Sequence, residues 1–161
     1  MKKTILCCLC FVICMTFSSC ENLDGEIINN FNAKKEYFEI LNNYFINYYN
    51  DNGSIDSLSF SFSENDNGQI EKIYDGNLYE YVELPENIIK AFSEIKCIFK
   101  YDFSYIFINN YRISYGGNGN EMYVFSRDGS KPKYFFSEDE DTNFSVYSLS
   151  DNWYYLFLKV R

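Results

Sequence analysis

Residues 57–63 read Ser-Leu-Ser-Phe-Ser-Phe-Ser, and this stretch decides the fold class. Leu58, Phe60 and Phe62 alternate with serines at a period of two residues. Because successive side chains of an extended chain point to opposite faces, the alternation predicts a half-buried β-strand. The residues before it follow a different period, so the chain changes from helix to sheet close to this point.

An amphipathic helix is predicted over residues 31–50. Polar side chains recur at helical spacing on one side, at Glu36, Glu39, Asn43, Asn47 and Asn50. Apolar and aromatic side chains lie on the other side, at Phe38, Leu41, Tyr44, Phe45 and Tyr48. This separation is typical of a helix that packs on a core. Residues 51–53, Asp-Asn-Gly, would end the helix, with Gly53 as a left-handed cap.

The residues after the first strand predict a turn, a hairpin and a second helix. The turn is Asn-Asp-Asn-Gly at 65–68, and the hairpin joins residues 69–74 to 78–84 through Asp-Gly-Asn at 75–77. Pro85 suits the first turn of a helix because its φ is already fixed near the helical value. Apolar residues then recur at helical spacing at Ile88, Phe92, Ile95 and Phe99. We therefore expect a helix over about 86–97.

The C-terminal part predicts further strands, at 103–108, 111–116, 121–126, 132–136, 144–149 and 152–160. Turn residues separate them at 109–110, 116–120, 127–129 and 150–152. Short connections favour neighbouring antiparallel strands. The expected fold is a single α+β domain over 31–161, an antiparallel meander-like sheet with two helices (about 31–50 and 86–97) packed on it.

The first twenty residues have the character of an export signal. Lys2 and Lys3 precede an apolar run over 5–17 that is interrupted only by Thr16. This run is short for a membrane-spanning helix, which needs roughly 20 apolar residues, and suits a secretory signal. Ser18 and Ser19 then lead into Cys20, after which the chain becomes polar and acidic.

The segment Phe17-Ser18-Ser19-Cys20 resembles the lipobox of bacterial lipoproteins, although Phe17 stands where Leu is commonest. The resemblance covers residues 1–20 only. It implies cleavage between Ser19 and Cys20, diacylglycerol on the Cys20 thiol and an acyl chain such as palmitate on the new amino group. Several acyl chains would give stable membrane anchoring. The alternatives are an ordinary signal peptide, which leaves Cys20 free, and an uncleaved anchor helix.

These features predict a signal peptide at 1–19, a lipidated polar tether at 20–30 with a turn at Asp24-Gly25, and the globular domain. Removing residues 1–19 takes away two lysines and no acid, so the formal charge changes from −9 to −11. Such a charge argues against nucleic acid and against adsorption to anionic lipid. It is compatible with a basic protein partner or with cations.

Cysteine and histidine usage narrows the chemistry further. Of six cysteines, four leave with the signal and Cys20 is used for lipid, so Cys97 remains alone and no intramolecular disulfide is expected. We expect Cys97 to be a small buried core residue. The chain has no histidine, which removes the commonest general base and metal ligand.

Three segments were weighed as sites, each against a structural interpretation. The acidic run 138–141 could bind calcium or a basic partner, but it matches no calcium motif, so a solvated loop is preferred. The glycine-rich 116–120 lacks the helix and the Lys-Ser/Thr pair of a phosphate loop, so a hairpin turn is preferred. Residues 153–155, Trp-Tyr-Tyr, could stack on sugars, but apolar side chains on both faces indicate a strand covered on two sides.

The sequence assigns no catalytic residue, no cofactor and no metal site, and we do not expect an enzyme. The expected function is a non-enzymatic binding or interaction protein at the bacterial cell envelope, lipid-anchored through Cys20. One narrower alternative is an immunity-type inhibitor of a basic toxin. Another is a lipoprotein that binds a small solute or carbohydrate, which would need a pocket lined by exposed aromatics. A hydrolase would need two facing carboxylates across a cleft, or an exposed Cys97 beside a base.

Overall fold

The computed structural model describes residues 2–52, 56–64, 67–99, 103–117, 121–132 and 143–159. Side chains are described from Gly25 onward, apart from those of Glu71, 143–144 and 158–159. The chain divides into two compact units, Met1–Ala33 and Lys34–Arg161. Helix α1 (Lys2–Asp51) supplies the first unit and enters the second, which also contains the sheet.

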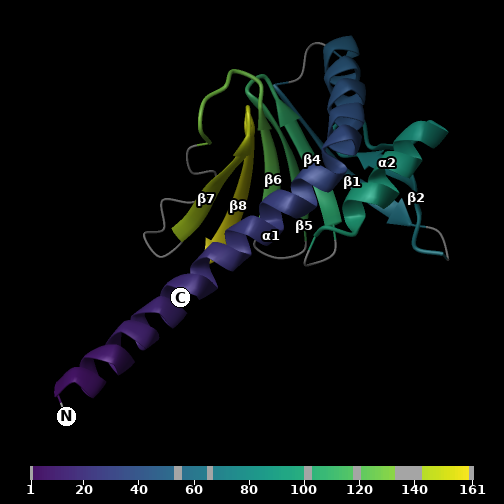
Figure 1. The fold of residues 1–161 in the computed structure, drawn as a ribbon. Helices are drawn as coiled ribbons and strands as arrows, with labels where there is room; N and C mark the ends of the chain where they lie inside the picture. The colour runs from purple at the N-terminus through teal and green to yellow at the C-terminus, as the bar shows by residue number, and fades with distance from the viewer. Residues whose placement is uncertain are drawn as a thin grey trace. The chain divides into compact units, whose positions relative to one another are not determined.

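The second unit is an α+β fold in which an eight-stranded antiparallel sheet carries two helices, as predicted (Figure 1). The remaining helix is α2 (Glu86–Lys96). The strands are β1 (Ser57–Glu64), β2 (Ile70–Asp75), β3 (Glu80–Glu83), β4 (Phe103–Asn109), β5 (Arg112–Gly117), β6 (Glu121–Ser126), β7 (Asn143–Ser150) and β8 (Trp153–Lys159). Their order in the sheet is β3-β2-β1-β4-β5-β6-β8-β7.

The sheet departs from a simple meander at its C-terminal end, where β6 pairs with β8 and β7 forms the edge. The side chains explain this exchange. Strand β8 buries Trp153 and Tyr155 on one face and Leu156 on the other, so both of its faces need cover. Strand β7 carries serines at Ser145 and Ser148, which tolerate an edge position. The prediction that 152–160 forms an interior strand is confirmed.

Helix α1 differs from the prediction at its N-terminal end. It begins at Lys2 and runs through Asp24 and Gly25, so the predicted turn there is wrong. A glycine within a helix costs roughly 1 kcal/mol relative to alanine, which a long run of helical neighbours can carry. Residues 53–55 are not described, so the predicted cap at Gly53 lies outside the described residues.

The C-terminal part of α1 packs its aromatic side on the sheet, as predicted. Phe38 is fully buried, with its ring 5.2 Å from that of Tyr115, 5.3 Å from Tyr123 and 5.1 Å from Trp153. Farther along, the ring of Phe45 lies 5.0 Å from that of Phe60 in β1. Burial of a phenylalanine side chain contributes roughly 1.5–3 kcal/mol, so this row of rings supplies much of the attachment.

Helix α2 buries four side chains, Ile88, Ala91, Phe92 and Ile95. The helix begins at Glu86, as predicted, with Pro85 as its N-cap residue, and the Pro85 carbonyl accepts the Ile88 and Ile89 amides. The expectation that Cys97 is buried is wrong. Cys97 is exposed because it follows the last helical residue and falls two positions past Ile95, off the buried stripe.

Two other sequence predictions fall partly outside the described residues. Of the predicted turn at 65–68, residues 65–66 are not described, and the remaining residues adopt a turn and a bend before β2. Of the predicted strand at 132–136, Pro132 lies outside any helix or strand and 133–136 are not described. The predicted hairpin is confirmed, since β2 pairs with β3 across residues 76–79.

The outer face of the sheet, opposite the helices, has a small apolar cluster of its own. Met122, Val124 and Leu156 are buried there, with Tyr105, Val146 and Tyr154 packed against them. Gly116 pairs with Tyr105 across β4 and β5, and a Cβ at Gly116 would overlap the Tyr105 ring. The missing side chain at Gly116 therefore makes the space in which this ring lies.

Gly116→Ala should lower the free energy of unfolding by about 1–3 kcal/mol, because the new methyl group forces the Tyr105 ring out of its packed position. Urea denaturation of the full chain measures this change. In a Tyr105→Ala background the same substitution should cost much less, which a double-mutant cycle resolves. Gly25→Ala is the matched control, since a Cβ at Gly25 meets nothing within 4 Å. An equal cost of Gly116→Ala in both backgrounds would contradict this account.

Candidate functional site

Cys20, the predicted lipidation residue, and Ser19, which precedes the predicted cleavage point, are part of α1. The structure does not describe their side chains. Cleavage and lipidation therefore stay predictions. Over the residues that the structure describes, no helix is both long enough and apolar enough to span a bilayer.

The structure gives a different outcome for each of the three candidate segments from the sequence. The acidic run 138–141 lies outside the described residues, and no cluster of three potential metal ligands occurs in the described part of the chain. Gly116 and Gly117 belong to β5, which pairs antiparallel with β6, and 118–120 lie outside the described residues. Trp153 is only 2% exposed and lies in the helix-facing core, so it offers no stacking platform.

The β2–β3 hairpin is fastened to the last turn of α1 through a buried carboxylate. Asp75 is fully buried and its Oδ2 accepts a hydrogen bond of 3.0 Å from the Tyr48 hydroxyl. Its Oδ1 accepts the backbone amides of Asn77 at 2.8 Å and Leu78 at 3.2 Å. Burial, and then the bond to Asp75, raises the pKa of Tyr48, so this phenol stays a donor. Asp75 therefore fixes the shape of the turn.

The tip of this hairpin presents large side chains to solvent. Tyr79 is 80% exposed, Tyr81 62% and Leu78 41%. Tyr79 has φ = 57°, a left-handed conformation that costs a non-glycine residue roughly 1–2 kcal/mol. Strained backbone of this kind is concentrated at functional sites. We call Leu78, Tyr79, Glu80, Tyr81 and Glu83 the hairpin tip.

A second carboxylate, that of Glu121, is also buried, at 3% exposure, and its partner is again a tyrosine hydroxyl. Its Oε2 accepts a hydrogen bond of 3.0 Å from the hydroxyl of Tyr155 on the neighbouring strand. Burial, and then the nearby Glu121 carboxylate, raises the pKa of Tyr155. Among the described residues, both buried acids thus accept a hydrogen bond from a tyrosine hydroxyl on another helix or strand, and the bond holds the two elements together.

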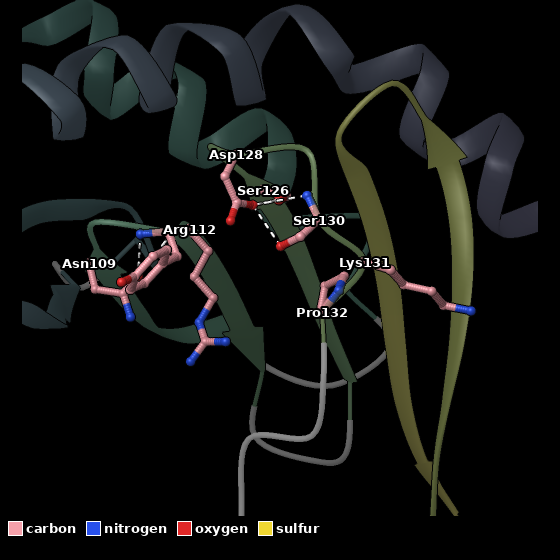
Figure 2. Close-up of a pocket in the computed structure, with 8 residues that line it drawn as sticks. Asn109, Arg112, Ser126, Asp128, Ser130, Lys131 and Pro132 are labelled. Atoms are coloured by element: carbon pink, nitrogen blue, oxygen red, sulfur yellow. Dashed lines mark hydrogen bonds between the residues drawn. The ribbon is translucent and has the colours of Figure 1, made fainter.

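A pocket of about 330 Å³ lies at the end of the sheet where β4, β5 and β6 meet (Figure 2). It is lined by Asn109, Tyr111, Arg112, Ser126, Asp128, Ser130, Lys131 and Pro132. These residues come from the end of β4, the start of β5 and the turn between them, and from the end of β6 and the segment that follows it. The lining combines charged, hydroxyl and amide side chains with Tyr111 and Pro132.

Asp128 is held rigidly on one wall of the pocket. Its Oδ1 accepts the Ser126 hydroxyl at 2.9 Å, the Ser130 amide at 2.9 Å and the Ser130 hydroxyl at 2.6 Å. These bonds, those from Ser130 first, lower the pKa of the carboxyl to about 2. Asp128 is therefore ionised at any physiological pH, and its Oδ2 receives none of the three bonds.

The opposite wall is braced by the turn between β4 and β5. Asn109 Oδ1 accepts the backbone amides of Tyr111 at 2.9 Å and Arg112 at 3.0 Å. The Arg127 side chain also contacts this turn, because its Nη1 donates a hydrogen bond of 3.1 Å to the Asn109 carbonyl. The Tyr49 hydroxyl of α1 lies 3.1 Å from Asn110 Oδ1, so the helix holds this turn in place.

The guanidinium of Arg112 lies 5.9 Å from the centre of the Phe107 ring, on the outer face of the sheet. Burial lowers the pKa of Arg112 to about 10, which leaves the group charged at neutral pH. In Figure 2 the Arg112 side chain points away from Asp128, and the Lys131 side chain points away from the other labelled residues.

Sequence reasoning missed both surfaces. Asp75-Gly76-Asn77 was interpreted only as a turn, and Arg127-Asp128-Gly129 likewise. The available signal was an Asp followed two residues later by Asn or Ser, which is typical of a side chain that bonds its own backbone. That signal predicts a rigid turn and does not predict what the turn presents.

The comparisons with known proteins add no relative. No protein-family model matches the chain, and neither the curated proteins nor the solved structures give a match.

Proposed function

We propose that this chain is a lipid-anchored protein of the bacterial cell envelope that binds a basic protein partner through its hairpin tip. The observation that carries the proposal is Tyr79, which is 80% exposed and held at a positive φ. A large aromatic side chain in a strained backbone has no benefit for folding, so we infer that it serves recognition.

The composition of the hairpin tip supports a protein partner. Tyrosine is among the side chains that contribute most to protein interfaces, because it buries a large rigid area with little loss of entropy. Tyr79 and Tyr81 project from one short hairpin with Leu78, where a core would have drawn them inward. Strand β3 is also a sheet edge, which offers backbone groups for a partner strand.

Charge supports a basic partner. Glu80 and Glu83 are exposed on the same hairpin, and Glu86 follows at the start of α2. The Lys72 ammonium lies 3.6 Å from Glu83 Oε1, and this pair is exposed, so it offsets only part of the negative charge. The whole chain has a formal charge of −9, which would steer a basic protein towards it.

The lipid anchor rests on the sequence of residues 1–20 and has a direct test. Mass spectrometry of the protein purified from bacterial membranes should find Cys20 as the first residue, with the mass of a diacylglycerol group and, where the amino group is acylated, a further acyl chain. Cys20→Ala should abolish both the lipid and the cleavage. An intact Met1, or an unmodified thiol at Cys20, would contradict the proposal.

Tyr79→Gly should abolish partner binding and leave the fold at least as stable, because glycine adopts a positive φ without strain. The measurement pairs a pull-down from envelope extract with thermal unfolding of the full chain. The captured protein should be basic and should be released as the salt concentration rises. Asn152→Gly is the matched control, since Asn152 is exposed and has φ = 63° on a different turn. Equal capture by wild type and Tyr79→Gly would overturn the assignment.

A further inference from the structure

Exposed large apolar side chains gather at one end of the sheet. Five such side chains occur in the part of the chain that the structure describes, and four of them are Leu78, Tyr79, Tyr81 and Tyr111. The first three belong to the hairpin tip, and Tyr111 belongs to the turn between β4 and β5. The fifth, Ile40, lies on α1, well before the helix ends. Single apolar residues are normal on a protein surface, whereas a cluster marks an interaction site.

The strand register places the hairpin tip and the β4–β5 turn at the same end of the sheet. Ser57 at the start of β1 pairs with Asn109 at the end of β4. The Ser57 carbonyl also accepts a hydrogen bond of 2.6 Å from Asn77 Nδ2, in the turn of the hairpin. The strand order β3-β2-β1-β4-β5 separates the two turns by three strand spacings, roughly 14 Å. A standard protein interface covers about 800 Å² on each partner, so one partner can cover both turns.

The β4–β5 turn is held as firmly as the hairpin. Asn109 Oδ1 accepts the Tyr111 amide at 2.9 Å, and the Tyr111 carbonyl accepts the Arg127 amide at 2.7 Å. The backbone on both sides of Tyr111 is thus bonded, while its side chain is 65% exposed. A tyrosine fixed in this way binds a partner with little loss of conformational freedom. The pocket of about 330 Å³ beside it offers a recess for one partner side chain.

The two halves of this surface carry opposite charge. The hairpin tip is acidic through its two glutamates. Beside the β4–β5 turn lie Arg112, Arg127 and Lys131, and Asp128 offsets one of these three positive charges. In Figure 2 the Lys131 side chain points away from the other labelled residues, and Lys131 is exposed. A partner that covers both halves therefore needs a basic part over the hairpin tip and an acidic part over the β4–β5 turn.

We propose that one protein partner contacts the hairpin tip and the β4–β5 turn together, with Tyr111 as a second aromatic contact. The inference rests on the proposed function, because it takes the basic partner of the hairpin tip as the occupant. It adds that the contact face of this partner becomes acidic roughly 14 Å from its basic part. This order of charges fixes the direction in which the partner lies across the end of the sheet.

Site-specific photo-crosslinking in the bacterial envelope tests whether the partner is shared. Tyr79, Tyr111 and Ile40 are replaced one at a time with benzoylphenylalanine in the full chain, and the crosslinked proteins are identified by mass spectrometry. The first two positions should crosslink the same basic protein, and Ile40, the matched exposed position on α1, should not. A partner at Tyr79 with none, with a different protein or with a second copy of this chain at Tyr111 would overturn the inference and leave the proposed function intact. The absence of any partner at both positions would overturn both.

Calorimetry with that protein, once identified and purified, measures the contribution of the second turn. Tyr111→Ala should weaken binding to the full chain about tenfold or more, as expected for a central aromatic contact. Thermal unfolding should not change, because both hydrogen bonds of Tyr111 belong to its backbone. Lys131→Glu should weaken binding several-fold, and Ile40→Ala, the matched control, should not. Unchanged affinity in Tyr111→Ala, or tighter binding in Lys131→Glu, would overturn the inference.

Discussion

Phe38 and Phe45 hold the C-terminal part of α1 against the sheet, and the positions of the other elements in this unit follow from that contact. Phe38 lies among rings from β5, β6 and β8, and Phe45 lies against β1 and the ring of Phe92 in α2. One helix thus contacts strands far apart in sequence. Because apolar burial is the dominant stabilising contribution in folding, this row of rings fixes which face of the sheet becomes the core.

The same helix ends in two neighbouring tyrosines that each hold a separate turn. The Tyr48 hydroxyl donates to Asp75, which shapes the turn of the hairpin tip. The Tyr49 hydroxyl lies beside Asn110, which belongs to the turn on the pocket wall, and the Arg127 guanidinium lies 5.5 Å from the centre of the Tyr49 ring. Both candidate surfaces are therefore loops held by the final turn of one helix. This arrangement is common in binding proteins, where a rigid scaffold positions exposed loops.

Local periodicity was sufficient to predict α2, the C-terminal part of α1, most strands and the α+β class, because alternation at Leu58, Phe60 and Phe62 reflects a face that must be buried. It could not predict the exchange of β7 and β8, which depends on competition between two strands for an interior position. It also failed at Cys97, which follows the last residue of α2 and lies off its buried stripe. The pocket could not be predicted because Arg112 begins β5 and Asp128 lies in the turn after β6, and only strand pairing brings these parts of the chain to one end of the sheet.

Amide hydrogen exchange of the full chain tests the central claim, that the last turn of α1 holds both surfaces. Tyr48→Phe should speed exchange at Asn77 and Leu78, whose amides bond to Asp75, and leave the pocket unchanged. Tyr49→Phe should speed exchange at Tyr111, Arg112 and Arg127 and leave the hairpin unchanged. Protection at all five amides equal to that of the wild type in both variants would contradict the claim, as would a uniform loss of protection across the sheet.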